Sequence, residues 1–256
     1  MEAIKFIVNW IIKYCKNHNI NTLVIGVSGG IDSAVTSTLC AKTGINTIVV
    51  SLPIYQKEKE LNRALKHQKW LLERFKNVQC ETINLDNLFD SWKTNMPNKY
   101  HSSLSLANSR ARIRMTTLYQ IASTNNGIVV GTGNKIEDFG IGFFTKYGDG
   151  GVDISPIADL KKSEVTHIGK QLEIINEIII APPTDGLWED GRTDEDQIGI
   201  TYDELEWAMD FKGSTKYLSK QQKASLKKYR ELHSTNQHKI KPIPVCILPK
   251  NRKFNF

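Results

Sequence analysis

Cysteine is scarce in this chain of 256 residues, and its four cysteines, Cys15, Cys40, Cys80 and Cys246, lie far apart. No two of them have the Cys-x-x-Cys spacing of metal-binding and redox motifs, and nothing indicates a secreted protein. This pattern argues against a scaffold built on disulfides. It indicates reduced thiols that serve mainly in packing, as in a cytoplasmic protein.

Long apolar runs are missing as well. Residues 1–19 carry apolar side chains at helical spacing, but Lys5, Asn9 and Lys13 interrupt them. This pattern predicts an amphipathic surface helix, and neither a signal peptide nor a membrane span. We therefore expect no membrane partner.

The chain also lacks a concentrated basic region, although its net charge is +7. Lysine and arginine are spread along it, and no basic run is interleaved with aromatic residues, so we expect no nucleic acid partner. The positive charge is compatible with either solvated lysines or attraction of polyphosphate substrates. A hydrophobic content of 40% is ordinary for a globular protein, and with no linker in sight we expect residues 1–256 to form a single domain.

Strands and helices are predicted to alternate. Strands are predicted at 22–27, 46–52, 79–85 and 127–132, and helices at 3–18, 32–43, 57–75 and 104–125, with more after 160. The expected fold class is α/β, a Rossmann-like open parallel sheet with helices on both faces. Ligands of such sheets bind beyond the carboxyl ends of strands. Residues 28–33 and 132–137 both follow strand ends, so they should meet at one crevice.

The first of these loops has the composition of a phosphate-binding turn. Gly29 and Gly30 let the backbone approach an anion closely, and Ser28 and Ser33 add hydroxyl donors. Asp32 would repel bare phosphate, so it indicates Mg²⁺ between the carboxylate and the phosphates. The loop has neither the Walker lysine nor the Gly-x-Gly-x-x-Gly spacing. The alternative is a turn of small residues without a ligand.

A second informative stretch runs from residue 131 to 156 and is rich in glycine around Phe143, Phe144 and Tyr147. Its composition argues against a regular helix or strand and predicts a long functional loop. We expect residues 139–151 to act as a mobile lid, because the segment has little intrinsic stability and its aromatic groups need a surface to pack on.

Together these motifs resemble a known family. The string Ser28-Gly29-Gly30-Ile31-Asp32-Ser33 is similar to the loop of the N-type ATP pyrophosphatases, the adenine nucleotide alpha hydrolase-like proteins. The resemblance narrows to the ammonia-dependent NAD synthetases through strings that stand in that family's order: Gly131-Thr132-Gly133-Asn134-Lys135-Ile136-Glu137, Gly142-Phe143-Phe144-Thr145-Lys146-Tyr147-Gly148-Asp149-Gly150-Gly151-Val152-Asp153, Ala111-Arg112-Ile113-Arg114-Met115, Pro182-Pro183-Thr184, Asp194-Glu195-Asp196-Gln197-Ile198-Gly199 and His238-Lys239.

The resemblance implies a ligase reaction that completes NAD biosynthesis. Deamido-NAD (nicotinic acid adenine dinucleotide), ATP and ammonia would give NAD, AMP and pyrophosphate through an acyl-adenylate. ATP and Mg²⁺ would be required, and the enzyme would be a cytoplasmic homodimer. No glutaminase signature surrounds any cysteine, so ammonia is expected from solution or from a separate partner.

The resemblance also implies roles for residues. Catalysis would fall to Asp32, Glu137 and Lys162, with Asp32 and Glu137 as the Mg²⁺ ligands. The positions that match ATP-binding ones are Gly26, Val27, Ser28, Gly29, Gly30, Ile31, Asp32, Ser33, Thr132, Lys162 and Thr184. Those that match deamido-NAD-binding positions are Arg112, Lys146, Asp153, His238 and Lys239.

Several of these residues have structural alternatives. Glu137 could be an acid in the first turn of a helix, Arg112 could pair with a helix carboxylate, and His238 could support structure. Residues 194–196 are expected to cap a helix after Thr193. The chain also departs from the family pattern, with Ser51 where an arginine often precedes Leu-Pro and one extra residue between Glu137 and Phe143.

Three other functions share the first loop. A pyrophosphatase that modifies tRNA would not be expected to carry the string from Lys146 to Asp153. An amidating enzyme similar to GMP synthetase differs in its acid substrate. An ATP-binding regulatory module would have less need of both Asp32 and Glu137 as metal carboxylates.

Overall fold

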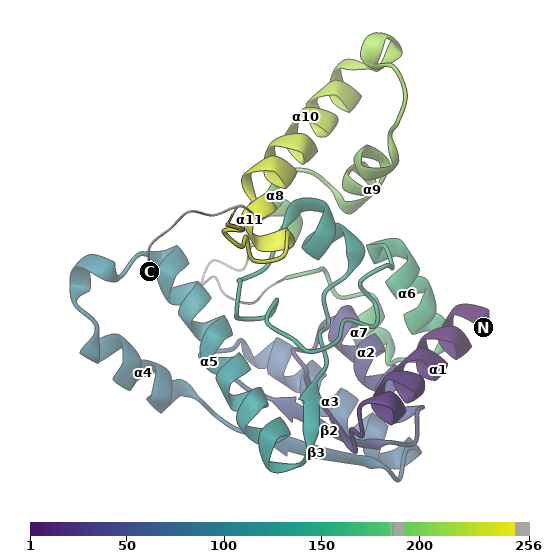
Figure 1. Cartoon of the computed structure of the whole chain (residues 1–256), viewed down its shortest axis with the longest axis vertical. Helices are drawn as coiled ribbons and strands as arrows, with labels where there is room; N and C mark the ends of the chain where they lie inside the picture. Colours follow the sequence, from purple (N-terminus) through teal and green to yellow (C-terminus); the bar gives the residue numbers. More distant parts are fainter. Residues whose placement is uncertain (185, 187–191, 249–256) are drawn as a thin grey trace.

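The computed structural model describes residues 1–184, 186 and 192–248. Its centre is a four-stranded sheet in the order β3-β2-β1-β4, with every pair parallel. The strands are β1 (Thr22–Gly26), β2 (Asn46–Ser51), β3 (Val78–Thr82) and β4 (Gly127–Val129) (Figure 1). The α/β fold with a parallel sheet is confirmed, and each of the four expected strands is present.

Four expected helices are also present, as α1 (Glu2–Asn17), α2 (Ile31–Ala41), α3 (Glu58–Arg74) and α5 (Ser103–Thr124). The others are α4 (Asp86–Asn95), α6 (Lys162–Gln171), α7 (Asn176–Ile179), α8 (Asp194–Ile198), α9 (Tyr202–Asp210), α10 (Lys220–Thr235) and α11 (Gln237–Ile240), with short 3₁₀ turns η1 (Asn98–Tyr100) and η3 (Thr215–Tyr217). Within the described ranges, no helix combines the length and apolar character needed to cross a bilayer.

The expectation of a long loop over residues 131–156 is wrong for residues 135–141. The glycine-rich stretch contains a seven-residue π-helix, η2 (Lys135–Ile141), which Asn134 caps by accepting from the N–H groups of Ile136 and Glu137. A π-turn accommodates one more residue than an α-turn, which fits the extra residue between Glu137 and Phe143. The helix is stabilised by tertiary packing, because Ile136 and Ile141 are buried against α8 and α9.

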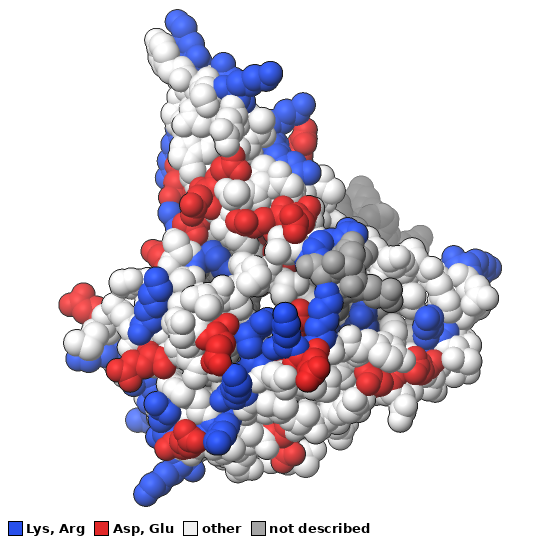
Figure 2. Space-filling model, turned by 180° about the vertical axis from the view of Figure 1, so that it is seen from behind, with Lys and Arg blue, Asp and Glu red and all other residues white. Residues whose placement is uncertain are grey.

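Helices α9 and α10 form a hairpin that projects from the body of the molecule (Figure 1). Its apolar cluster is separate from the cores on the sheet and includes Ile198, Tyr202 and Leu205. Figure 2 shows Lys and Arg side chains interspersed with Asp and Glu over the visible face, with basic side chains also along the projecting hairpin. The positive charge is therefore spread out on this face.

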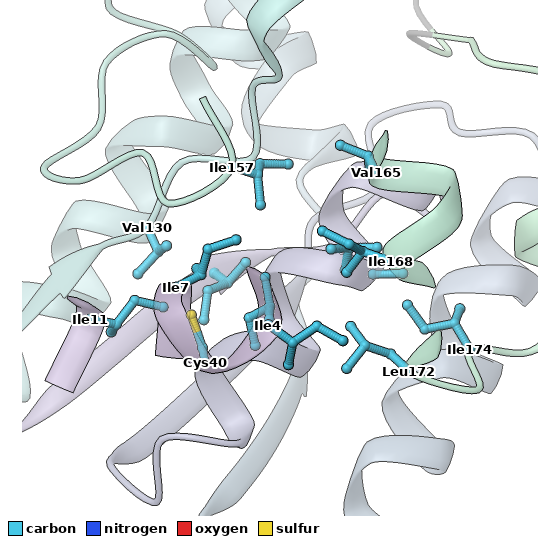
Figure 3. Packing of buried hydrophobic residues seen from close by; sticks show 14 of the residues in the cluster. Ile4, Ile7, Ile11, Cys40, Val130, Ile157, Val165, Ile168, Leu172 and Ile174 are labelled. Carbon is cyan, nitrogen blue, oxygen red and sulfur yellow. The ribbon is translucent and has the colours of Figure 1, made fainter. Parts of the chain in front are cut away.

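The sheet is covered on both faces, as predicted. Alternate residues of β1 point to opposite sides, so Leu23 and Ile25 pack on α1, α2 and α6, while Val24 packs on α5. Figure 3 shows the first of these clusters, where Ile4, Ile7 and Ile11 of α1 lie near side chains of α2 and α6. This packing fixes the carboxyl end of β1, where the chain turns into α2.

Candidate active site

A cavity of about 630 Å³ lies at the carboxyl end of the sheet. It is lined by the turn between β1 and α2, by the start of α3, and by α5, which packs beside β4. Further lining comes from the segment 130–133, η2, the loop after it, α6, residues 181–184 and 186, α8 and α11. Strand order reverses between β1 and β4, which is where open α/β sheets bind ligands.

The turn between β1 and α2 has a shape that only glycine permits at one position. Gly29 has a φ of 86°, and a Cβ there would lie 2.4 Å from the carbonyl oxygen of Glu60. Ser33 closes the turn, since its hydroxyl donates to the carbonyl of Gly30 over 3.0 Å and accepts from the N–H of Ser28 over 3.3 Å. The N-terminus of α2 thereby faces the cavity, as an anion site requires.

Next to this turn, two carboxylates share one ammonium group. Lys162 Nζ lies 2.6 Å from Asp32 Oδ2 and 2.9 Å from Glu137 Oε1, and these side chains are 9%, 17% and 15% exposed, respectively. Asn134 Nδ2 donates to Asp32 Oδ1 over 3.1 Å, and the Tyr202 hydroxyl donates to Glu137 Oε1 over 2.5 Å. The structure thus brings together the three residues expected to be catalytic.

Burial and charge act in opposite directions on this cluster. Burial raises the pKa of Asp32, which the Lys162 ammonium only partly offsets. Burial also raises the pKa of Glu137, but Lys162 and the Tyr202 hydroxyl outweigh it and hold that pKa below its ordinary value. Burial lowers the pKa of Lys162, yet the two carboxylates raise it more, so the ammonium stays charged.

The donor set at Asp32 and Glu137 suits a metal that arrives with a nucleotide. Mg²⁺ in such sites is bound by one or two carboxylates, with phosphates and water as further ligands. Among the described residues no group of three or more His, Cys, Asp and Glu side chains could form a ligand set. Two carboxylates near an anion-binding turn therefore fit Mg²⁺ bound with ATP.

The opposite wall of the cavity is held together by contacts between the loop after η2 and α11. Lys146 Nζ donates to the His238 carbonyl over 2.8 Å, and Lys239 Nζ donates to the Phe144 carbonyl over 2.7 Å. Arg112 Nε donates to the Lys146 carbonyl over 3.2 Å. The structure shows the segment held over the cavity, and its motion as a lid stays a prediction.

Most of the expected site residues line the cavity. These are Gly26, Val27, Ser28, Gly30, Ile31, Asp32, Ser33, Arg112, Thr132, Glu137, Lys146, Lys162, Thr184, His238 and Lys239. Gly29 lies behind the turn, against α3. Asp153 is exposed outside the described lining, and its carboxylate accepts from the Tyr119 hydroxyl and the Val129 N–H over 3.0 and 2.8 Å. Its binding of substrate stays a prediction.

The structure gives different outcomes for the structural alternatives suggested for residues 194–196, Glu137 and Arg112. The helix after Thr193 is confirmed as α8, with a capping box between Thr193 and Asp196. Glu137 is both an acid in the first turn of η2 and a cavity residue. Arg112 forms no ion pair with a carboxylate in the part of the chain that the structure describes, so that alternative is wrong. From the sequence we also expect residues 184–198 to become ordered when ligand binds, and of these, residues 185 and 187–191 lie outside the described residues.

Several residues of the site were missed in the sequence. Tyr202 and Arg63 reach the site from α9 and α3, and no local pattern marks them. Asp138 and Asp149 also line the cavity, and burial raises the pKa of each. Neighbouring carboxylates raise the pKa of Asp138 further, whereas a hydrogen bond from the Thr145 N–H partly offsets the effect of burial on Asp149. Asp138 directly follows the quoted string that ends at Glu137, and Asp149 lies within the string 142–153, so both could have been found.

Comparison with known proteins agrees with this geometry. A model of the NAD synthase family matches residues 3–243. An NH3-dependent NAD(+) synthetase of Mesoplasma florum is 38% identical over 208 residues, which are 80% of this chain and 82% of the relative.

Two solved structures extend the likeness. An NMN synthetase from Francisella tularensis is 34% identical with a TM-score of 0.85, and the match covers 97% of this chain and 98% of that one. An NH3-dependent NAD synthetase from Campylobacter jejuni, solved with nitrate ion, is 25% identical with a TM-score of 0.77, over 96% of this chain and 98% of that one.

Proposed function

The chain belongs to the NAD synthase family, which catalyses the ATP-dependent amidation of deamido-NAD by ammonia, and we propose how its own residues divide this work. The observation that carries the proposal is the cluster of Asp32, Lys162 and Glu137 between an anion-binding turn and a basic wall. One side of the cavity suits polyphosphate, and the other suits an anionic acid substrate.

The turn at residues 28–33 binds the phosphates of ATP in this proposal. Asp32 and Glu137 would hold Mg²⁺, which supplies charge neutralisation on the phosphate oxygens. Lys162 contacts both carboxylates over less than 3 Å and can exchange one of them for a phosphate oxygen as ATP enters. Thr132 and Thr184, which line the same cavity, complete the nucleotide side.

The wall formed by Arg112, Lys146, His238 and Lys239 binds the acid substrate. A carboxylate is a poor electrophile, so its oxygen first attacks the α-phosphate, forming an acyl-adenylate and releasing pyrophosphate. Ammonia then attacks the carbonyl carbon and AMP leaves. Fixed donors act on the charge that develops on oxygen in both steps. The packed loop 143–151 would keep water away from the acyl-adenylate.

The direct test incubates the purified protein with ATP, Mg²⁺ and deamido-NAD, with and without ammonium, and measures NAD, AMP and pyrophosphate. NAD and AMP should form in equal amounts, and NAD should appear only when ammonium is present. ADP and phosphate as the products, or AMP release independent of the acid, would contradict the assignment.

A second candidate substrate is the mononucleotide analogue of deamido-NAD, nicotinate mononucleotide. The observation that favours it is the likeness to the NMN synthetase, whose TM-score and identity both exceed those of the Campylobacter jejuni enzyme. Both acids carry the same reacting carboxylate, so the cluster at Asp32 serves either one. Competition of the two acids in one assay, read as the ratio of NMN to NAD, decides between them.

We also propose that the protein works as a homodimer in the cytoplasm. Large apolar side chains are exposed on α4, η1 and the start of α5, namely Leu88 (53%), Trp92 (49%), Tyr100 (56%) and Leu104 (61%). A patch of this kind supports a two-fold contact. Light scattering should give a dimer that Trp92→Lys dissociates and Trp10→Lys, on α1, leaves intact. The four cysteines are free, which agrees with a reducing compartment.

A further inference from the structure

The first turns of α3 pack directly against the phosphate-binding turn. A Cβ on Gly29 would lie 2.4 Å from the carbonyl oxygen of Glu60 and 3.1 Å from the Cβ of Arg63. Two side chains from this region also hold the backbone of the turn. Gln56 Nε2 donates to the Ser28 carbonyl over 3.2 Å, and Arg63 Nε donates to the Gly29 carbonyl over 3.1 Å.

These two hydrogen bonds orient the peptide groups of the turn. The Gly30 N–H donates to Ser28 Oγ over 3.3 Å, so the serines of the turn hold its backbone as well. The turn leads into the N-terminus of α2, the end of a helix that attracts anions.

Arg63 has more donors than this anchoring uses. A guanidinium group has five N–H donors in a rigid fork, and Nε uses one of them here. In the described part of the chain, no hydrogen bond or ion pair engages its two terminal nitrogens, and the side chain lines the cavity. The fork therefore lies beside the anion-binding turn with its terminal donors available.

Three lysines of the cavity are already engaged. Lys162 is bound between Asp32 and Glu137, and Lys146 and Lys239 donate to backbone carbonyls on the opposite wall. ATP brings several negative charges to the turn, and the Asp32 carboxylate adds one more. Arg63 supplies a cation on the side where the charge of the β- and γ-phosphates would otherwise be met mainly by backbone dipoles.

We propose that Arg63 is a phosphate-binding residue of this site, with Nε holding the turn and the terminal nitrogens binding the β- and γ-phosphates. The assignment rests on the proposed function for its role in turnover. When the substrate carboxylate oxygen bonds to the α-phosphorus, the bond from that phosphorus to the oxygen bridging to the β-phosphate breaks. The electron pair stays on pyrophosphate, and Arg63 stabilises the charge it gains.

The test compares two ligands that differ in the groups Arg63 would touch. Binding of pyrophosphate with Mg²⁺ and binding of AMP are measured by calorimetry on the wild type, Arg63→Gln, Arg63→Lys and the control Lys69→Gln. Lys69 is an exposed residue of the same helix, so its variant removes the same charge away from the cavity. AMP carries only the α-phosphate, and it reports whether the turn keeps its shape.

Arg63→Gln should weaken pyrophosphate binding about 10- to 100-fold, as for loss of charge-assisted hydrogen bonds, and change AMP binding less than about twofold. Arg63→Lys should lose part of the affinity for pyrophosphate because lysine lacks the fork, and Lys69→Gln should match the wild type. Equal weakening of both ligands, or unchanged pyrophosphate binding, overturns the proposal. If Arg63→Gln fails to fold, Arg63→Lys gives the same comparison.

The binding assays contain no acid substrate, so they separate this proposal from the proposed function. A wild-type protein that binds pyrophosphate through Arg63 but makes no AMP from ATP and deamido-NAD would contradict only the function. A protein that makes NAD normally, with pyrophosphate binding unchanged in Arg63→Gln and Arg63→Lys, would contradict only the role of Arg63.

Discussion

Replacing Lys162 with methionine tests whether the two carboxylates of the site depend on one cation. Methionine keeps much of the length and volume of lysine but removes the charge. Asp32 and Glu137 would then be largely buried, each with an oxygen that had lain within 3 Å of the ammonium. The repulsion between them, formerly screened by Lys162, would act directly on the folded state.

The expected loss of stability follows from the separation of the two carboxylates. Two like charges about 5 Å apart repel by about 3 kcal/mol at an effective dielectric constant of about 20. Removing one partner of a buried ion pair costs about 3–5 kcal/mol in other proteins. We therefore expect the free energy of unfolding to fall by about 3–5 kcal/mol in Lys162→Met at about pH 8.

The loss should depend on pH in a defined direction. Without Lys162, the folded-state pKa of the carboxylate pair rises above its unfolded value, so the extra instability is present above the folded pKa. It disappears as the pH falls through that pKa, because one carboxylate takes up a proton. The gap between variant and wild type should thus be widest near about pH 8 and narrower near about pH 5.

Urea unfolding followed by circular dichroism at both pH values measures these differences. The matched control is Lys161→Met, which removes the neighbouring lysine from its ion pair with Asp210, whose side chain is 60% exposed. An exposed pair of this kind contributes at most about 1 kcal/mol. If Lys162→Met were no less stable than Lys161→Met, or if its deficit grew toward acid, the reasoning about the buried cluster would be wrong.

Three further outcomes are expected. Asp32→Asn keeps the shape of the turn but removes a carboxylate from the site, so AMP and pyrophosphate formation should fall at least about 100-fold, and near-normal turnover would remove the assigned role. Ammonium should support NAD synthesis and ammonia-free glutamine should not, because glutamine use would need a reactive thiolate, and no cysteine is among the described cavity residues. Burial raises the pKa of Cys15 and Cys40, and burial together with Glu81 raises that of Cys80 to about 11. Equal rates with ammonium and with glutamine would refute this. Burial lowers the pKa of His67 to about 4, so the unfolded chain takes up the proton at a higher pH than the folded chain does. The free energy of unfolding of the wild type should therefore fall by about 2 kcal/mol between about pH 6.5 and pH 5. In urea unfolding, His67→Gln should show a smaller fall, and the exposed control His18→Gln should show the same fall as the wild type.

The sheet was predictable because its signals are local. The two central strands, which are covered on both faces, carry short apolar runs at Leu23-Val24-Ile25 and Ile48-Val49-Val50. The helix α4 was not expected, since Phe89 is its only buried residue and Leu88 and Trp92 are exposed. A helix with so little buried surface has a weak apolar period, and its sequence resembles that of a loop.

The π-helix was not predictable for a different reason. Phe139 and Gly140 of η2 have low helix propensity, and the helix depends on Ile136 and Ile141 packing against α8 and α9. Those partners lie more than fifty residues further along the chain. Propensity describes the isolated segment, whereas the stability of η2 comes from residues distant in sequence.

Residues of the candidate site were likewise predictable where they lie close together in the sequence, and not where they lie far apart. The turn at 26–33 is contiguous, so its glycines, hydroxyl groups and carboxylate are visible in one string. The contact from Lys162 to Asp32 joins residues 130 positions apart, and the one from Tyr202 to Glu137 joins residues 65 positions apart. Without the family resemblance, the sequence gives no reason to place Lys162 between two carboxylates, and Tyr202 is absent from the expected set altogether.

The two carboxylates of the site come from different packing units. Asp32 and Lys162 belong to helices α2 and α6, which share the core on the sheet, whereas Glu137 lies on η2, which shares its apolar cluster with α8 and α9. Tyr202, from α9, contacts Glu137 and lies under Lys162, with its ring centroid 5.0 Å from Nζ. The distance between the carboxylates is thus set by how the projecting hairpin packs against the body. This explains why a polar network, and not apolar packing alone, joins the units at the cavity: Lys162 holds them together when no nucleotide is bound, and the phosphates and Mg²⁺ can take over that contact when ATP enters.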